Sequence, residues 1–441
     1  MRKRTPSPAK TLAFLLIGAA VMIGLSFLPP VKRRLNDFWV DVRFFFNPPA
    51  EVVFVPTQQA QLDLLSTPTQ PESLLTPTAT PLPTELATPT LTPTPLPLYV
   101  RLSGVVYVDQ ANRWNYCGPA NLTMALKFWG WSGTRDDVAA AVKPGRNDPN
   151  EDFIERGRTD VNVMPYELVN FVNEQTEFRA LWRYGGDIAL LHRLLAAGYP
   201  VVVEKGHFDT DSSGAFSWMG HYQFVTGYDD ADGTFLVQDT YHYGPNHLVA
   251  YEQFEAEWRA FNFLFYIVYP PEREAEVYAI LGNWGDPVWA NQHALEVARA
   301  DTQSLTDPWG LYFAWFNVGT ANVQLYQYAD AASAYDYAFQ LYANLGTDNT
   351  QRPYRMLWYQ TGPYFAYYYT GRYQDVINLA NITLASSRFG PTLEESLYWR
   401  AMAEYALGDY ASAYADMRQT VYYNPNFAPG WAKLQEWGLS P

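Results

Sequence analysis

The pattern of hydrophobic and polar residues changes several times along the chain, first near the N-terminus. Residues 11–28 form a run of 18 positions without a charged side chain, after four basic residues in segment 1–10. A helix of that length reaches roughly 27 Å at about 1.5 Å per residue, close to the hydrocarbon thickness of a bilayer. The pattern predicts a transmembrane helix at 11–28, followed by a juxtamembrane segment at 29–55.

Two interpretations of this hydrophobic run are open. A cleaved secretory signal would end in a small-x-small motif, whereas Phe27, Leu28 and Pro29 stand at the end of this one, so we expect an uncleaved signal anchor. Basic residues before the span favour an N-terminus inside the cell and folded domains outside the cytoplasm. The basic residues at 32–34 weaken this orientation signal.

In the middle of the chain the pattern predicts a helix and a pair of strands. After Cys117, the apolar residues Leu122, Ala125 and Leu126 recur at helical spacing, and Pro119 is tolerated in a first helical turn. Polar and apolar side chains alternate over residues 221–226, GYDDADG supplies a turn, and FLVQD resumes an apolar strand. We therefore predict a buried helix that begins near Cys117 and, further along, an antiparallel hairpin.

From about residue 272 onward the pattern is helical and rich in Ala, Tyr and Trp. Three stretches share one phase, and their turn positions at Tyr326, Gly371 and Gly408 are 45 and 37 residues apart. The clearest stretch, LGDYASAYADMRQTVYYNP, resembles a tetratricopeptide repeat. We predict an all-α, tetratricopeptide-like helical repeat domain at 272–441, whose concave face would bind a peptide or a partner protein.

Composition separates a spacer from the globular parts. Fifteen of the 22 residues from 76 to 97 are Thr or Pro, which favours an extended polyproline II conformation with a reach of up to about 70 Å. We predict a semi-rigid linker at 56–98 that holds the folded part away from the membrane. The chain is 48% hydrophobic and 17% charged, as globular proteins are, and its net charge of −15 argues against a nucleic-acid partner.

Cys117 is the only cysteine in the 441 residues, so it cannot form an internal disulfide. At the positive end of the predicted helix its thiol is pushed toward the nucleophilic thiolate, although a free cysteine can also be inert packing. In the predicted hairpin His221 begins one strand and Asp239 ends the other, at the same end of the pair. A carboxylate placed there can orient an imidazole beside a nucleophile. The alternatives are a half-buried histidine and a turn-capping aspartate.

Four segments carry a resemblance to a known family: CGPANLTMAL, LLAAGYPVVVE, GHYQFVTGYDD and VQDTYHYGPNHLVAYEQFEAEW. They resemble the papain-like cysteine peptidases that process double-glycine leaders of bacteriocins, and their stand-alone relatives. The resemblance implies an α+β papain-like domain at 99–271. It also implies that Cys117 is the nucleophile, His221 the general base, Asp239 the orienting carboxylate, and Gln110 an oxyanion-hole donor beside the Cys117 N–H. Gln110 departs from the family pattern, since it lies seven residues before the cysteine instead of six.

A metal site is the competing interpretation of the histidines. His221, Asp239, His242 and His247 are close in sequence, but neither a second cysteine nor an HExxH motif accompanies them. Residues 148–152 alternate as at the start of a calcium loop, without the glycine and glutamate that such a loop requires. We expect no metal ion and no cofactor.

Together these features predict a single-pass, membrane-anchored cysteine peptidase outside the cytoplasm, with a peptide or protein substrate and a protein partner on the repeats. Two alternatives stay open: a cell-wall peptide amidase with the same three residues, and a non-catalytic scaffold that binds peptides. Leader peptidases of this kind act in the cytoplasm on an export transporter, and no ATPase segment follows within this sequence. A location outside the cytoplasm therefore argues against bacteriocin leaders as the substrate.

Overall fold

The structure is a computed structural model, and it describes residues 53–58, 95–111, 113, 115–143, 145, 162–210, 216–387 and 393–440. No helix in these ranges is long and apolar enough to cross a bilayer. The predicted span at 11–28, the basic segment at 1–10 and most of the predicted linker lie outside the described residues.

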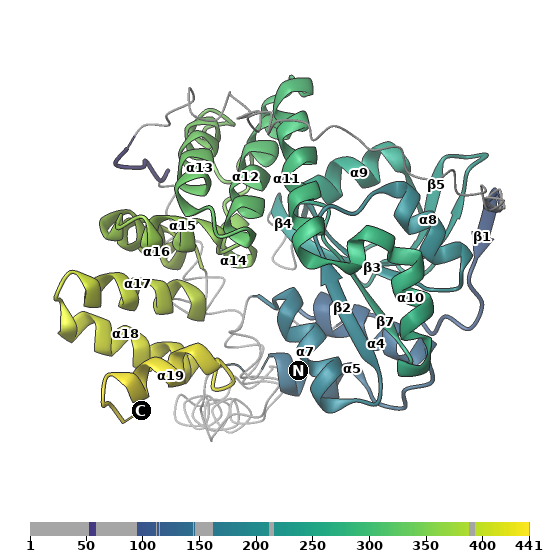
Figure 1. Cartoon of the computed structure of the whole chain (residues 1–441), viewed down its shortest axis with the longest axis horizontal. Coiled ribbons are helices and arrows are strands. Elements are labelled where there is room, and N and C mark those ends of the chain that lie inside the picture. Colours follow the sequence, from purple (N-terminus) through teal and green to yellow (C-terminus); the bar gives the residue numbers. More distant parts are fainter. Residues whose placement is uncertain are drawn as a thin grey trace, which may run out of the picture.

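The first part of the described chain is built on a seven-stranded antiparallel sheet (Figure 1). Six strands follow the order β2-β7-β3-β4-β5-β6, and β1 pairs with β4. The predicted hairpin is present as β4 and β5, with Phe224 opposite Gln238 and Val225 opposite Val237. The strands are β1 (Tyr99–Arg101), β2 (Arg179–Arg183), β3 (Val201–Thr210), β4 (Phe216–Asp229), β5 (Thr234–Gln238), β6 (His247–Ala250) and β7 (Phe265–Tyr269).

Helices cover both faces of this sheet. Successive side chains of a strand point to opposite faces, so Val202 and Phe224 enter one hydrophobic cluster while Val203 and Val225 enter another. The first cluster includes residues of α4 (Cys117–Phe128), α5 (Arg135–Val142) and α7 (Pro165–Gln175), and the second those of α8 (Ile188–Ala196), α9 (Tyr251–Arg259) and α10 (Glu274–Leu281). The central strands are therefore apolar on both sides, apart from the polar positions described below.

The rest of the described chain is helical, as predicted for 272–441. Two short 3-10 helices, η1 (Pro271–Arg273) and η2 (Gly282–Gly285), flank α10. The following helices form an arc of successive packed neighbours (Figure 1). They are α11 (Pro287–Ser304), α12 (Pro308–Gln324), α13 (Tyr328–Ala343), α14 (Met356–Tyr359), α15 (Gly362–Tyr369), α16 (Tyr373–Ser386), α17 (Glu394–Ala406), α18 (Tyr410–Tyr423) and α19 (Ala428–Glu436).

The predicted turn positions of the repeats lie between helices. Tyr326, Gly371 and Gly408 have φ angles of 60°, 75° and 86°, and they separate α12 from α13, α15 from α16, and α17 from α18. This left-handed conformation is one in which glycine loses nothing to steric strain. The relation of the arc to tetratricopeptide repeats stays a prediction.

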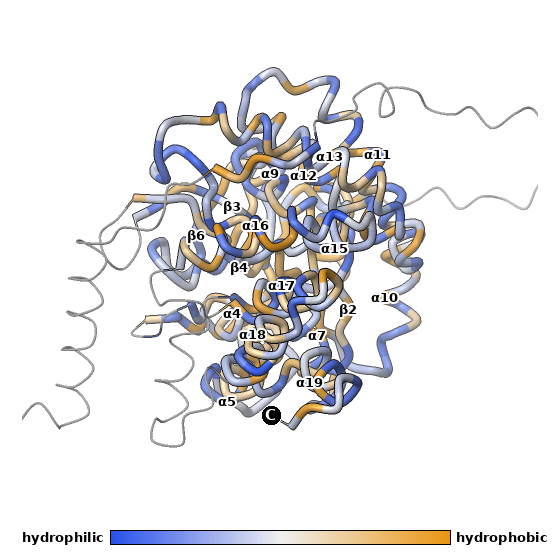
Figure 2. The backbone as a smooth tube through the Cα atoms, turned by 90° about the vertical axis from the view of Figure 1, so that its left-hand side faces the viewer, coloured by the Kyte–Doolittle hydropathy of each residue, from blue (hydrophilic) through white to orange (hydrophobic). Residues whose placement is uncertain are grey.

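The helical region contacts the sheet domain at several places, and two of them show the extent of the contact. At the first, the Trp218 ring of β4 lies 6.2 Å from the ring of Tyr359 in α14. At the second, Asn426, just before α19, donates from Nδ2 to the carbonyl oxygen of Ala141 in α5 at 2.7 Å. Figure 2 views the molecule from the repeat side, with α17 to α19 across its front. The arc of helices thus contacts the sheet domain both at strand β4 and at helix α5.

Candidate active site

Cys117 is the first residue of α4, and the start of this helix lies against β4. The packing there is close, since a Cβ added to Gly118 would lie 3.3 Å from Val163. Asn121 follows Cys117 by one helical turn, and its Nδ2 donates to the carbonyl oxygens of Cys117 at 2.9 Å and Tyr222 at 2.8 Å. These two bonds fix the start of α4 relative to β4.

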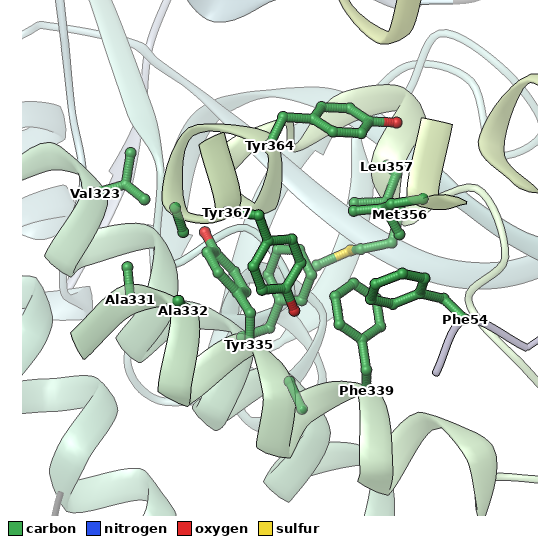
Figure 3. Packing of buried hydrophobic residues seen from close by; sticks show 14 of the residues in the cluster. Phe54, Val323, Ala331, Ala332, Tyr335, Phe339, Met356, Leu357, Tyr364 and Tyr367 are labelled. Atoms are coloured by element: carbon green, nitrogen blue, oxygen red, sulfur yellow. The ribbon is translucent and has the colours of Figure 1, made fainter. Parts of the chain in front are cut away.

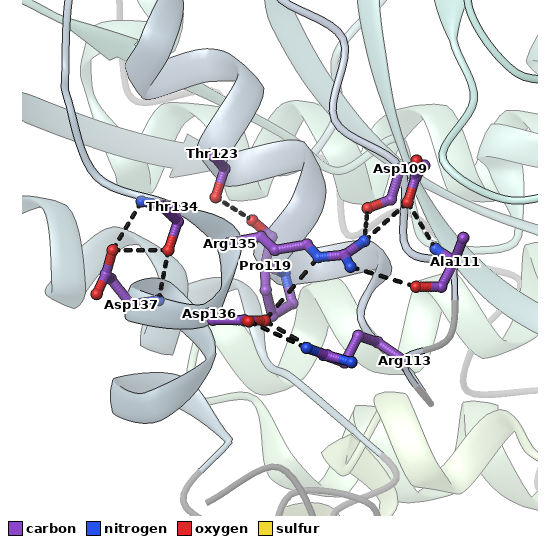
Figure 4. A network of polar contacts seen from close by, with 9 residues as sticks. All are labelled: Asp109, Ala111, Arg113, Pro119, Thr123, Thr134, Arg135, Asp136 and Asp137. Carbon is purple, nitrogen blue, oxygen red and sulfur yellow. Dashed lines mark hydrogen bonds and ion pairs between the residues drawn. The ribbon is translucent and has the colours of Figure 1, made fainter.

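The loop before Cys117 is held by Arg135 at the start of α5 (Figure 4). Arg135 donates to Asp109 Oδ1 at 2.8 Å and to the carbonyl oxygen of Ala111 at 3.2 Å, and it also bonds the Asp109 carbonyl. Gln110 lies between these two anchored residues. The arginine therefore restrains the backbone that carries the predicted oxyanion-hole side chain.

His221 and Asp239 meet where β4 runs beside the end of β5. His221 Nε2 lies 3.1 Å from Asp239 Oδ2, and both side chains are buried. Gln223, two residues after His221 on the same strand, donates to the same Oδ2 at 3.2 Å. The other oxygen, Oδ1, accepts from the backbone N–H of Tyr241 at 2.9 Å. Donors on both oxygens therefore hold the carboxylate in one orientation.

His221 lies beside the Cys117 thiol, close enough for each group to shift the pKa of the other. Because Nε2 of the imidazole faces Asp239, Nδ1 is the nitrogen available to the sulfur. The structure thus brings three of the four residues singled out in the sequence into one series of sulfur, imidazole and carboxylate.

The charges of this series reinforce one another. Burial disfavours the imidazolium, but the charge of Asp239 and the hydrogen bonds outweigh it and raise the pKa of His221 to about 9. Burial also acts to raise the pKa of the Cys117 thiol, yet the hydrogen bond and charge of His221 bring that pKa below its ordinary value. The same imidazolium holds the pKa of Asp239 far below its usual range, against the effect of burial. These shifts all act in favour of the thiolate, the imidazolium and the carboxylate.

Gln110 lies beside Thr240, the residue after Asp239. Its backbone N–H donates to the Thr240 carbonyl at 3.0 Å, and its Oε1 accepts from Thr240 Oγ1 at 2.9 Å. The carboxamide oxygen is therefore engaged, and Nε2 is the atom that can donate to a ligand. The structure places Gln110 next to the carboxylate end of the series, and these bonds do not join it to Cys117.

Sequence reasoning missed two residues that position the series, Asn121 and Gln223. Both had a local signal. Asn121 lies four residues after Cys117 and so on the same face of the helix, while Gln223 lies two residues after His221 and so on the same face of the strand. Polar residues at those offsets inside apolar elements indicate a hydrogen-bonding role.

Lys205 was also missed, and it had no local signal. It is buried, lies opposite His221 in the β3–β4 register, and pairs with Glu257 of α9 at 2.6 Å. Burial acts to raise the pKa of Asp239 and His221 lowers it, and the positive charge of Lys205 adds a smaller lowering. The position follows from the pairing of two distant strands, which the sequence pattern does not specify.

The histidines weighed for a metal site have other contacts. His242 Nε2 lies 2.9 Å from the Thr210 carbonyl, and the His247 ring stacks on Tyr243 at 4.4 Å. Across the part of the chain that the structure describes, no group of three or more His, Cys, Asp or Glu residues is placed to hold a metal ion. Residues 148–152 lie outside that part.

Comparison with known proteins connects the sheet domain to a peptidase family. Residues 102–265 match the model of the Peptidase_C39 like family. The crystal structure of a Bacillus anthracis protein described as a C39-like peptidase is similar over 39% of this chain and 97% of that chain, with 19% identity and a TM-score of 0.30. No curated protein matches the chain. Residues 102–265 thus form a C39-like peptidase domain of mixed α/β content, and the matched range includes Gln110, Cys117, His221 and Asp239.

Proposed function

We propose that the chain is a membrane-anchored cysteine peptidase that acts outside the cytoplasm and hydrolyses peptide bonds with Cys117 as the nucleophile. One observation carries the proposal: Cys117, at the start of α4, lies beside His221, which is paired with Asp239, inside a C39-like domain. The family match supports cysteine peptidase chemistry, and the geometry supports these three residues as its carriers. The uncharged run at 11–28 supports the anchor.

In the first half of the reaction His221 holds the proton and Cys117 is the thiolate. The sulfur attacks the carbonyl carbon of a peptide bond, so that a C–S bond forms and the carbonyl oxygen becomes an oxyanion. The Cys117 N–H and Nε2 of Gln110 are the proposed donors to that oxyanion. When the intermediate collapses, the C–N bond breaks and His221 gives its proton to the leaving amine.

Water completes the reaction. Neutral His221 accepts a proton from a water molecule, whose oxygen attacks the thioester carbon. The C–S bond then breaks, the carboxylic product leaves, and the proton kept by His221 restores the starting pair with the Cys117 thiolate. Asp239 holds Nε2 of the imidazole throughout, so that Nδ1 faces the sulfur, the leaving amine and the water in turn.

The single thiol makes the chemistry directly testable. Iodoacetamide should label Cys117 faster than an ordinary thiol at neutral pH, and His221→Ala should slow the labelling by about tenfold or more, because the thiolate loses its counter-ion. His192→Ala is the matched control, since His192 is half-buried and stacks on Tyr228 at 4.0 Å in another part of the domain. Equal labelling rates in the native chain and the His221 variant would overturn the proposed chemistry.

Substrate assays separate the peptidase from its alternatives. We expect the native chain to cleave an unfolded protein substrate such as casein, and Cys117→Ser to be inactive. Cleavage of peptidoglycan fragments without cleavage of protein would overturn the peptidase proposal and support a cell-wall amidase. A rate of Cys117 labelling equal to that of an ordinary thiol, together with no cleavage of either substrate, would support the non-catalytic scaffold.

A further inference from the structure

Residues 53–58 are far from the helical region in sequence, yet they lie on it. Phe54 is 4% exposed, and its ring packs against Phe339 and Tyr367 at centroid distances of 4.8 and 5.9 Å (Figure 3). Val55, the next residue, is 74% exposed. The segment therefore inserts one aromatic side chain between helices and turns its neighbour to solvent.

Phe54 lies in an apolar groove that is formed by several helices. The pocket beside Phe54 is lined from α13, α14 and α16 among others, and its residues include Tyr342, Met356, Leu357, Leu379 and Ile382. Aromatic side chains contribute most of the buried area in such contacts. Phe54 thus fills a site that is shaped by the packing of the repeats.

Thr57 makes the second contact, with a buried ion cluster. Its N–H donates to Asp375 Oδ1 at 3.0 Å, and its hydroxyl donates to Asp375 Oδ2 at 2.7 Å. Asp375 also accepts from Arg372 at 2.7 Å, and Arg372 donates two bonds to Asp336 at 2.7 and 2.8 Å. One cation thus faces two carboxylates, so Asp375 needs more donors than Arg372 supplies.

The shortage of hydrogen-bond donors to Asp375 explains why a peptide fits beside it. The Asp375 side chain has no exposed surface, and a buried carboxylate is stable only when its oxygens are hydrogen-bonded. Without Thr57 it would lose two donors at once. The groove therefore suits a peptide that brings a backbone N–H and a hydroxyl to Asp375 and an aromatic ring three residues earlier. Pro56 favours the extended backbone between these two points.

We propose that the groove formed by α13, α14 and α16 is a peptide-binding site, and that residues 54–57, Phe-Val-Pro-Thr, are its internal ligand. The peptides that it takes are extended and carry an aromatic residue followed three positions later by Thr or Ser. This deepens the partner-binding role that the sequence predicts for the helical region. It does not depend on the chemistry at Cys117.

Docking of residues 54–57 on the helical region attaches the N-terminal end of the predicted Thr/Pro-rich linker to the folded part of the chain. After residue 58 the chain is next described at residue 95, and the Leu98 carbonyl accepts from the Asp230 N–H at 2.8 Å, just before β1 pairs with β4. Both ends of the linker are therefore held on the folded body. A peptide that displaced residues 54–57 would free the N-terminal end of the linker from the helical region.

Binding of a labelled peptide to the full chain tests the site. The probe is fluorescein-labelled EVVFVPTQQA, the sequence of residues 51–60. In the native chain the internal segment competes at high effective concentration, so we expect the Phe54→Ala/Thr57→Ala double variant to bind the probe at least about tenfold more tightly. Val55→Ala, at the exposed position, is the matched control and should bind like the native chain. Equal affinity of the native chain and the double variant would overturn the proposal.

Two further measurements do not rely on that affinity. Amide hydrogen exchange in α13 and α16 should become faster in the double variant and slow again when the probe is added, and unchanged exchange would overturn the proposal. Sedimentation tests whether the segment binds within its own chain. A native dimer that becomes a monomer in the double variant would show that the segment docks on a second copy, and would overturn internal docking.

Discussion

Asp239 both orients His221 and raises its pKa, so one substitution removes two effects. Asp239→Asn keeps the shape of the side chain and is expected to lower kcat/KM by roughly 10²- to 10⁴-fold, the scale on which the orienting carboxylate of a triad contributes. Cleavage of a peptide substrate measures the loss. Asp187→Asn is the control, because Asp187 caps α8 by accepting from Leu190 N–H, a role that asparagine also fills. A control as damaged as Asp239→Asn would contradict a specific role for Asp239.

The pH dependence follows from the same pKa shifts. In the proposed mechanism, activity requires a deprotonated Cys117 and a protonated His221. As the pH rises, activity should first increase when the thiol ionises, at a pH below its ordinary pKa, and then fall as the pH passes about 9, where His221 loses its proton. Asp239→Asn should move the basic limb of kcat/KM to lower pH, since it removes the negative charge that raises the pKa. A basic limb that stays in place in this variant would assign it to another group.

At the scale of elements, the hydrogen bonds of Asn121 fix the position of α4 on β4. Asn121→Leu removes the bonds to the Cys117 and Tyr222 carbonyls inside a buried contact. We expect a loss of about 1–3 kcal/mol in the free energy of unfolding, because buried acceptors lose their donor. We also expect a lower kcat, because the start of α4 carries the sulfur. Urea unfolding and peptide cleavage measure the two effects.

A second asparagine that links a helix to a strand separates stability from catalysis. Asn173 makes two hydrogen bonds to the backbone of Ala180, between α7 and β2. Asn173 is exposed, so Asn173→Leu should cost less free energy of unfolding than Asn121→Leu, and it should leave kcat unchanged under conditions where the variant is folded. If both variants lost activity in proportion to stability, Asn121 would have no positioning role beyond that of any amide that links a helix to a strand.

The elements that the sequence predicted well are those with a local pattern. The helix that begins at Cys117 and the hairpin of β4 and β5 follow from the period of their apolar positions, and Gly371 and Gly408 mark turns that need a left-handed backbone. That His221 and Asp239 lie close together also follows from a hairpin, because its two strands bring residues at the same end side by side.

Contacts between elements that are distant in the sequence could not be predicted from the sequence pattern. Lys205 lies opposite His221 only because β3 pairs with β4 in one register. The Gln110 side chain bonds Thr240, 130 positions away, and Thr57 bonds Asp375, 318 positions away. The sequence pattern assigns Phe54 and Thr57 to a juxtamembrane segment and a linker, since neither composition nor period shows that they pack on helices.

At the scale of the whole molecule, the sheet domain and the helical region share a hydrophobic core. Trp218 of β4 is 1% exposed and stacks against Phe313 of α12 at 6.0 Å. It also crosses Gly206 of β3, where a Cβ would lie 2.2 Å from the indole, so that strand needs glycine at this point. Because Trp218 lies three residues before His221, the contact that joins the two parts adjoins the candidate active site.

Trp218→Ala should therefore destabilise both parts of the molecule together. Removing a large buried aromatic side chain costs about 3–5 kcal/mol, and since the cluster spans both parts, we expect one unfolding transition at a lower temperature. Calorimetry measures the transition, and hydrogen exchange in β4 and α12 shows whether both elements lose protection. Trp431→Ala is the control, because that indole is 37% exposed on α19 and its removal opens no buried cavity. Two separate transitions, in the native chain or in the Trp218 variant, would contradict the shared core and show that the helical region unfolds as an independent unit.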